Sequence, residues 1–279
     1  MQPMISSPGG KRRYSAPALE KGLAILELLA SHPDGLTQAA IAREMGRSVG
    51  EIFRMVNVLE GRGYVRLCQP GDRYILSLKL YSFAHRHGRL RQLTTAAALP
   101  MDALARDLGQ SCHLTVFGQN GVVVVAHAQT PEAPSLTTQV GTTVPLLRAS
   151  SGHLLLAFAD AATRRMMLEE AYGEDEGRCI MDDWHLLWDD IRIRGYEERE
   201  SYQIKGVTNI SHPVFDFSGT CTASLNVPFL ERLDRPDARS PGSIHPLVRA
   251  AARAISADLG APDRPDTANS GPMNEIVYS

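Results

Sequence analysis

Apolar residues recur at helical spacing in the N-terminal quarter of the chain. One face of a helix over residues 18–30 is formed by Leu19, Leu23, Leu26 and Leu29, and the segment 31–35 ends it. A second, short helix begins after Thr37, a good capping residue, and ends at Gly46. Ser48 and Glu51 then have the spacing of a capping box, so a third helix is predicted to begin there.

The third helix is predicted to have one buried and one exposed face. Its apolar stripe consists of Ile52, Met55, Val56 and Leu59, which leaves Gly50, Phe53, Arg54 and Asn57 facing outward. Two short strands, residues 64–67 and 73–76, follow around a turn at residues 69–72. Three helices and a hairpin predict a winged helix-turn-helix domain over residues 15–77.

The pattern changes in the remainder of the chain. Residues 78–93 are predicted to form a linker helix, followed by a helix over 96–108 and strands over 111–117 and 122–128. Three further helices are expected from Ser150 onward, and the third of them covers residues 182–194. A hairpin of residues 206–215 and 220–228 follows, and a last helix covers residues 245–259. This alternation favours an α+β domain with an antiparallel sheet over residues 94–261.

Both ends of the chain have a composition that cannot bury a core. Residues 1–14 are predicted to be a flexible basic arm, and residues 262–279 a disordered tail. The cluster Lys11, Arg12 and Arg13 fits either a contact to DNA or a merely solubilising tail, and the sequence does not separate the two.

Charge is divided unevenly along the chain. Residues 11–91 contain 14 Lys and Arg against 7 Asp and Glu, whereas residues 92–279 contain 15 against 24. Because phosphate affinity depends on local cation density, a polyanion such as double-stranded DNA is the expected partner of the first part only. No apolar run approaches the roughly 20 residues of a membrane helix, and residues 1–10 do not resemble a signal peptide. The sequence therefore predicts a cytoplasmic protein with no membrane partner.

The helix-turn-helix pattern assigns candidate DNA contacts. Arg54 is the best base or phosphate contact, Asn57 fits adenine, and Glu51 serves either as a cap or as an acceptor for cytosine, with the cap favoured. Phosphate contacts are expected from Arg47, Arg66 and Arg73. The full predicted DNA-binding set is Arg47, Ser48, Gly50, Glu51, Phe53, Arg54, Asn57, Arg66 and Arg73.

Other chemistry is poorly supported. The four cysteines are widely spaced and are interpreted as buried thiols, and the nine histidines show no metal-ligand spacing. Dinucleotide, P-loop and nucleophile-elbow motifs are missing from the sequence, so we predict no cofactor, no metal and no catalytic residue. One enzymatic alternative stays open, in which Ser150 or Ser151 acts with His153 in acyl transfer by a hydrolase or transferase that the basic module only localises.

The order of these parts resembles the IclR family of bacterial transcriptional regulators over residues 18–260. The resemblance rests on the segments 18–26, 59–65, 73–80, 145–153, 194–196, 206–207 and 213–216. It implies a winged helix-turn-helix joined by a linker helix to a GAF/PAS-like effector-binding domain. It also implies a ligand-responsive regulator, repressor or activator, that acts as a homodimer or tetramer on operator DNA. Where the family commonly has Ser-Thr in the recognition helix this chain has Gly50 and Glu51, so no operator sequence is carried over.

The same resemblance implies an effector site in the second domain. Its predicted residues are Arg148, Ser150, Ser151, Arg199, Asn209, Ser211, Ser224 and Asn226. Strand alternation places Asn209 with Ser211 on one face, and a helix beginning at Ser150 offers free amides to an anion. With Arg148 and Arg199 as cationic partners, a small carboxylate or aromatic acid is the favoured effector. A regulator whose second domain only holds the oligomer together is the other alternative.

Overall fold

The computed structural model describes residues 16–69, 71–86, 88–118, 120–132, 135–231 and 239–263. The predicted N-terminal arm lies outside these residues, as does the predicted tail apart from Pro262 and Asp263. The chain divides into two compact units, residues 1–88 and 89–279.

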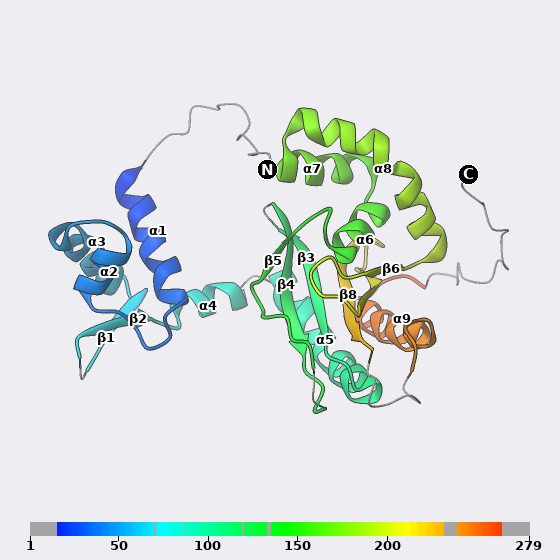
Figure 1. The fold of residues 1–279 in the computed structure, drawn as a ribbon, viewed down its shortest axis with the longest axis horizontal. Helices are drawn as coiled ribbons and strands as arrows, with labels where there is room; N and C mark the ends of the chain where they lie inside the picture. Colours follow the sequence, from blue (N-terminus) through cyan, green and yellow to red (C-terminus); the bar gives the residue numbers. More distant parts are fainter. Residues whose placement is uncertain are drawn as a thin grey trace. The chain divides into compact units, whose positions relative to one another are not determined.

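Residues 16–77 of the first unit form three helices and a two-stranded sheet (Figure 1). The helices are α1 (Pro17–Ala30), α2 (Gln38–Glu44) and α3 (Val49–Gly61), and β1 (Val65–Cys68) pairs antiparallel with β2 (Arg73–Leu76). Side chains cap the two later helices, since Thr37 Oγ1 accepts from the amide of Ala40 at 3.2 Å and Ser48 Oγ from that of Glu51 at 3.3 Å. The predicted winged helix-turn-helix is confirmed.

One core holds the first unit together. Ile25 of α1, Ile41 of α2 and Ile52 of α3 are each fully buried, and Val65 and Tyr74 extend the core to the wing. Leu36 also pairs with Tyr74, which ties the turn after α1 to the hairpin. Gly35 makes this possible, because a Cβ there would lie 2.5 Å from Ile75 Cγ2 and the residue has a φ of +71°.

The predicted break between the linker helix and the next helix is wrong. α4 spans Lys79–Arg86, and α5 then runs without interruption over Gly88–Leu108, where we expected one helix to end at 93 and another to begin at 96. Leu93, Ala97, Met101 and Leu104 are all buried along one stripe of α5, which crosses the expected break. Packing of this stripe therefore keeps the helix continuous.

The second unit is built on a six-stranded antiparallel sheet with the strand order β5-β4-β3-β8-β7-β6. Its strands are β3 (Cys112–Gly118), β4 (Gly121–Ala128), β5 (Thr143–Pro145), β6 (Glu197–Glu200), β7 (Val207–Phe215) and β8 (Cys221–Leu230). The predicted pairing of the last hairpin is confirmed by the ladder from Val207 to Phe215. The short edge strands β5 and β6 were not predicted.

Helices cover both faces of this sheet. α5 and α9 (Pro241–Asp258) share a core with Ile210 and Val214 of β7 and Leu225 of β8. On the other face lie α6 (Ser150–Phe158), α7 (Ala161–Tyr172) and α8 (Glu174–Arg194), whose core includes Trp188 (Figure 1). Strand alternation thus sends Ser211, Ser224 and Asn226 toward α6.

The start of α8 corrects another prediction. We expected this helix to begin at 182, whereas it begins at Glu174 directly after Gly173, which has a φ of +88°. Three acidic residues in its first turn, at positions 174–176, favour the positive end of the helix dipole. The acidic composition that obscured the helix in the sequence therefore helps to begin it.

Candidate functional site

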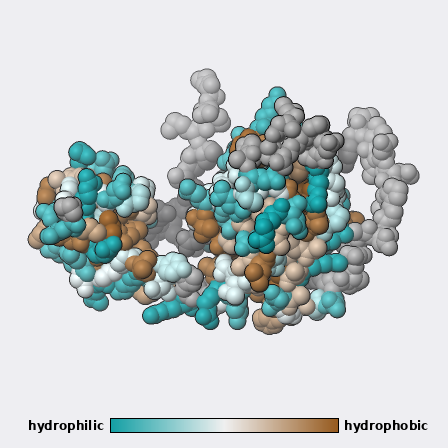
Figure 2. Space-filling view, turned by 90° about the horizontal axis from the view of Figure 1, so that it is seen from below, coloured by the Kyte–Doolittle hydropathy of each residue, from teal (hydrophilic) through white to brown (hydrophobic). Residues whose placement is uncertain are grey.

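The outward face of α3 carries the predicted reading positions. Gly50, Phe53, Arg54 and Asn57 are exposed, whereas Ile52 and Val56 on the opposite side are fully buried. Arg47 and Ser48, just before the helix, are also exposed. Figure 2 shows hydrophilic residues spread over the visible surface with small groups of hydrophobic ones among them. The face of α3 is thus available to contact a ligand as large as DNA.

Glu51 differs from the prediction. Ser48 Oγ accepts a hydrogen bond from the Glu51 amide, as expected. The Glu51 carboxylate, however, forms an ion pair with Lys21 of α1 and does not accept a hydrogen bond from the Ser48 amide. The hydrogen bond from Lys21 holds the pKa of the Glu51 carboxyl below its usual value, and the charges of Arg47 and Arg54 act in the same direction. The predicted hydrogen bond from the Ser48 amide to the Glu51 side chain is therefore wrong, and this carboxylate instead connects α3 to α1.

The wing carries the two predicted phosphate-binding arginines. Arg66 on β1 and Arg73 on β2 are both exposed. Arg73 Nη1 also donates to the carbonyl of Gly35 at 2.9 Å, so this side chain holds the wing against the turn after α1. Its position is fixed by a contact that sequence spacing does not reveal.

In the second unit, buried polar side chains gather on the sheet face beneath α6, and we call them the polar face. Cross-strand register places Glu197 beside Ser211, Ser211 beside Asn226, and Asn226 beside His113. Ser224 and Thr115 form the neighbouring row, and Ser150 and Ser151 come from the start of α6. The members of the polar face are Thr115, Ser150, Ser151, Glu197, Ser211, Ser224 and Asn226, all of them buried, together with the half-buried His113 and His127.

Hydrogen bonds connect these side chains to one another. Ser211 Oγ lies 2.7 Å from Asn226 Oδ1 and 2.9 Å from Ser150 Oγ. Because a hydroxyl has one proton, Ser211 donates to Asn226 and accepts from Ser150. Ser224 Oγ donates to the same Asn226 oxygen at 2.8 Å, while Asn226 Nδ2 donates to Thr115 Oγ1 at 3.1 Å. A ligand that binds at this face would have to replace these hydrogen bonds with bonds to its own polar groups.

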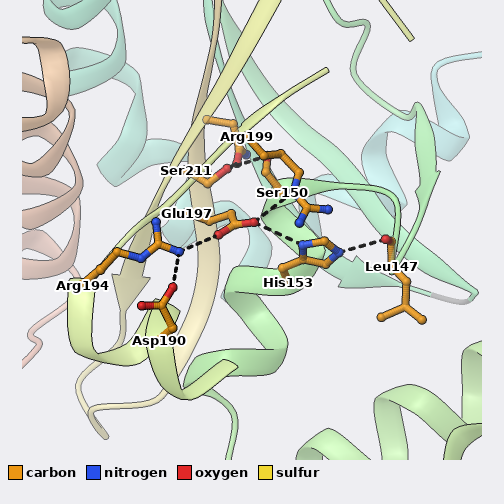
Figure 3. Close-up of polar contacts among 9 residues, drawn as sticks. Leu147, Ser150, His153, Asp190, Arg194, Glu197, Arg199 and Ser211 are labelled. Atoms are coloured by element: carbon orange, nitrogen blue, oxygen red, sulfur yellow. Dashed lines mark hydrogen bonds and ion pairs between the residues drawn. The ribbon is translucent and has the colours of Figure 1, made fainter. Parts of the chain in front are cut away.

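Glu197 connects the polar face to His153 and to two arginine side chains (Figure 3). Its carboxylate lies 3.3 Å from His153 Nδ1, 3.2 Å from Arg199 Nε and 3.4 Å from Arg194 Nη2. Glu197 is only 1 % exposed, so these contacts compensate the burial of its charge.

His153 is fully buried between two acceptors. Its Nδ1 faces Glu197 Oε1, and its Nε2 lies 2.8 Å from the carbonyl oxygen of Leu147. Both contacts are satisfied only when both ring nitrogens carry a proton. Neither nitrogen is directed at Ser150, whose hydroxyl bonds to Ser211, so the arrangement does not form the nucleophile and base of an acyl-transfer enzyme.

The remaining predicted effector residues are placed unequally. Arg199 pairs with Asn209 across β6 and β7 on the polar-face side, and both are half-buried. Arg148 is not brought into this cluster: it is exposed, and its guanidinium lies 5.9 Å from the ring centre of Tyr202. Arg148 precedes α6, and its side chain lies near Tyr202.

Two histidines of the polar face were not predicted as part of it. Burial, reinforced by the neighbouring His127, lowers the pKa of His113 to about 4. His127 Nε2 is buried without a hydrogen-bond partner among the described residues. Strand alternation relative to Asn226 was the signal that would have found them.

The cysteine prediction holds only in part. Cys112 is buried, and its desolvation raises the pKa of the thiol to about 12, but Cys179 is exposed and Cys68 and Cys221 are half-buried. Within the described residues no three side chains of the metal-binding types gather into a site, and no helix is long and apolar enough to cross a membrane.

A winged helix-turn-helix with a solvent-facing third helix, joined to a sheet domain with a buried polar face, defines a transcriptional regulator with an effector-binding domain. Comparison with known proteins identifies the family. The family model described as "Bacterial transcriptional regulator IclR C-terminal" matches residues 89–257, and "IclR helix-turn-helix domain" matches residues 18–67. The chain belongs to the IclR family of bacterial transcriptional regulators.

Individual relatives agree with this assignment. The chain is 28 % identical over 246 residues to the glycerol operon regulatory protein of Streptomyces coelicolor, covering 88 % of this chain and 96 % of that protein. Pseudomonas aeruginosa HmgR has a similar structure, with a TM-score of 0.66 and 27 % identity over 88 % of this chain and all of that chain. An IclR homologue from Microbacterium hydrocarbonoxydans complexed with 4-hydroxybenzoate shares the fold, with a TM-score of 0.66 and 21 % identity over 87 % of this chain and 98 % of that chain.

Proposed function

We propose that this regulator binds operator DNA as a homo-oligomer through α3 and the wing, and that a small carboxylate or aromatic acid at the polar face controls this binding. The observation that carries the DNA part is the division of α3 into a buried stripe and an exposed face with Arg54 and Asn57. Arg54 reads a base or a phosphate, Asn57 reads a base, and Arg47 and Arg66 contact phosphates. Ser48, Gly50 and Phe53 complete the contact surface, Arg73 supports it from the wing, and Glu51 acts through Lys21.

The DNA part is tested with duplex fragments selected from random sequence by the purified full-length protein. Arg54→Ala is expected to weaken binding of the selected duplex by about tenfold or more, since one Arg contact to a base contributes about 1–3 kcal/mol. Arg178→Ala is the matched control, because Arg178 is an exposed arginine of α8 in the other unit. Equal affinities of Arg54→Ala and the wild type would show that α3 does not read DNA in this way.

The effector part rests on the concentration of buried hydrogen-bonding groups on the polar face. Ser150, Ser211, Ser224 and Asn226 supply hydroxyl and amide groups beneath the N-terminus of α6, whose free amides and dipole favour an anion. The unpaired His127 Nε2 adds a further polar atom on the same side of the sheet. Ser151, Arg199 and Asn209 complete the proposed site at its edge, while the placement of Arg148 supports no role beyond its rim. The 4-hydroxybenzoate complex of the Microbacterium hydrocarbonoxydans homologue supports an aromatic acid as effector.

A screen of small acids for release or retention of the selected duplex tests this site. Ser150→Trp is expected to bind DNA but to ignore the effector, because the indole would occupy the space above Ser211. Ser211→Ala, a smaller change, is expected to reduce effector affinity while the duplex affinity without effector stays that of the wild type. An unchanged response of both variants would refute the site.

The proposed mechanism is thermodynamic linkage and involves no catalysed reaction. An effector that binds one conformation of the second unit better than another shifts the operator affinity by that difference. Should no acid alter DNA binding while the isolated second unit still assembles, the domain serves only to hold the oligomer together. The expected assembly is a dimer or tetramer in the cytoplasm, with half-sites about 34 Å apart or a multiple of that distance.

A further inference from the structure

A cavity of about 660 Å³ lies on the second unit beside the polar face, none of whose residues lines it, and we call it the arginine groove. Its walls come from the C-terminal ends of α6 and α8, the end of β7, α9, and residues 261–263. Figure 1 shows the end of α8 approaching α9 beside β6. The volume lies within the range of about 300–1,000 Å³ that is typical of small-molecule sites.

The groove exists because β6 is short. β6 pairs with β7 only from Glu197, opposite Ser211, to Glu200, opposite Thr208, so residues 212–215 of β7 have no strand on that edge. The backbone there is already protected: Pro213 has no amide, and the amide of Phe215 donates to Ser256 Oγ of α9 at 3.0 Å. The edge therefore offers a ligand little backbone hydrogen bonding and does not suit an added strand.

The floor of the groove is apolar. Phe158 of α6 and Phe215 of β7 meet edge to face, with ring centres 5.5 Å apart, and Ala252 and Ala257 of α9 lie alongside. His212 also borders the cavity, but its Nε2 is hydrogen-bonded to His245 Nδ1 at 3.1 Å, and burial lowers the pKa of His212 to about 3. A neutral histidine beside two phenyl rings favours the apolar body of a ligand.

The charged groups of the groove are strongly one-sided. Among the described residues, four arginines, Arg192, Arg194, Arg249 and Arg253, line it together with one carboxylate, that of Asp263. Arg192 is held in position by two donations to the carbonyl of Ala157, at 3.0 and 2.6 Å, and pairs with no carboxylate among the described residues. Its positive charge is therefore oriented but not neutralised.

Arg194 provides an independent sign of a missing partner. Its Nη2 is bound to Asp190 at 2.7 Å and to Glu197 at 3.4 Å, whereas its Nε is buried and has no acceptor among the described residues. A buried donor without an acceptor costs about 1–3 kcal/mol, and a bound anion is one way to satisfy it. Asp190 and Glu197 compensate the charge of Arg194 but leave this donor unused.

We propose that the arginine groove is a second ligand site, distinct from the polar face, for a small carboxylate with an aromatic or branched apolar body. The carboxylate is held by Arg192 and by Nε of Arg194, and the apolar body lies against Phe158 and Phe215. None of the polar-face residues lines the groove, which lies along β7 beyond the end of β6, although Arg194 also contacts Glu197. This inference goes beyond the proposed effector site and does not depend on it.

Fluorine NMR of the full-length protein with 4-fluorophenylacetate tests the proposal, with the uncharged 4-fluorophenylacetamide as matched probe. Arg192→Gln is expected to weaken binding of the acid about tenfold, as loss of one charge-assisted contact does. Ala257→Trp, at an exposed position on the groove wall, is expected to abolish binding by filling the cavity. Both groove variants are made in the Ser150→Trp background, which blocks the proposed effector site, and Arg178→Gln, at the other end of α8, is the control and is expected to bind like this parent.

The outcomes separate this site from the effector site. Stronger binding of the acid than of the amide to the Ser150→Trp parent, lost in both groove variants and kept in Arg178→Gln, supports the arginine groove. Absence of binding to this parent, or binding that survives either groove variant, places the acid elsewhere and overturns the proposal. No detectable binding of the acid to the wild type at millimolar concentration overturns it as well. Near-ultraviolet circular dichroism establishes that each variant is folded.

Discussion

Substitution of Glu197 by Gln tests whether the buried carboxylate organises the polar face. Gln keeps the size of the side chain and one acceptor oxygen but removes the charge that His153, Arg194 and Arg199 share. The two arginine side chains are 32 % and 38 % exposed, so water replaces much of what they lose, and each such pair contributes about 1 kcal/mol or less. His153 is fully buried and has no such replacement.

Most of the effect is therefore expected through His153. Replacing the charged acceptor of a buried hydrogen bond costs about 1–3 kcal/mol, and the remaining acceptor oxygen of Gln moderates this, so we expect a loss of about 2 kcal/mol in the free energy of unfolding. For a unit of this size that loss lowers Tm by about 4–8 °C.

Urea unfolding followed by tryptophan fluorescence measures this loss in the correct unit, because both tryptophans, Trp184 and Trp188, lie in α8. Glu200→Gln is the control, since Glu200 is an exposed residue of the same strand and its substitution is expected to change stability by less than about 0.5 kcal/mol. A loss below about 1 kcal/mol in Glu197→Gln would refute the reasoning that the carboxylate stabilises the second unit through its buried contact with His153.

Three further predictions concern stability. The pKa of His113 is about 4 in the folded protein and about 6.5 when unfolded, so the unfolded state binds the proton more readily. The free energy of unfolding therefore falls as pH drops from about 6.5 to 4. His113→Asn is expected to make this fall less steep in urea titrations at a series of pH values. Gly35→Ala is expected to destabilise the first unit by about 1–3 kcal/mol, since its Cβ would meet Ile75 and Tyr74; an unchanged thermal midpoint of that unit would contradict the close approach. Ser211→Ala leaves Ser150 without its buried partner and is expected to lower the free energy of unfolding in urea by about 1–3 kcal/mol. An unchanged free energy of unfolding would contradict this hydrogen bond.

The helix-turn-helix was predictable because its information is local. The spacing of Ile52 and Val56 determines which face of α3 is buried, and Thr37 and Ser48 mark the helix starts within three residues of the amides they cap. The pairing of Glu51 with Lys21 joins residues 30 positions apart, and spacing along α3 carries no sign of it. The sequence pattern therefore indicated the exposed face but not how α3 is anchored.

In the second unit the prediction was limited by charged and long-range elements. β6 has the sequence Glu-Glu-Arg-Glu, which lacks an apolar alternation, yet Glu197 is buried because His153, Arg194 and Arg199 converge on it. Ser211 and Asn226 were predicted by alternation on the correct strands, whereas His127 joins the polar face only through cross-strand register. The direction of Arg148 could not be predicted, because it lies outside α6, where no periodicity determines it.

The central claim is that the basic first unit binds duplex DNA through its cations. The most direct measurement is the affinity of the full-length protein for a selected duplex as a function of salt concentration. We expect the affinity to fall steeply and linearly on a double logarithmic plot, with Arg66→Ala reducing the slope by about one. If the protein binds no duplex, or binds one with an affinity that salt does not change, the claim is wrong.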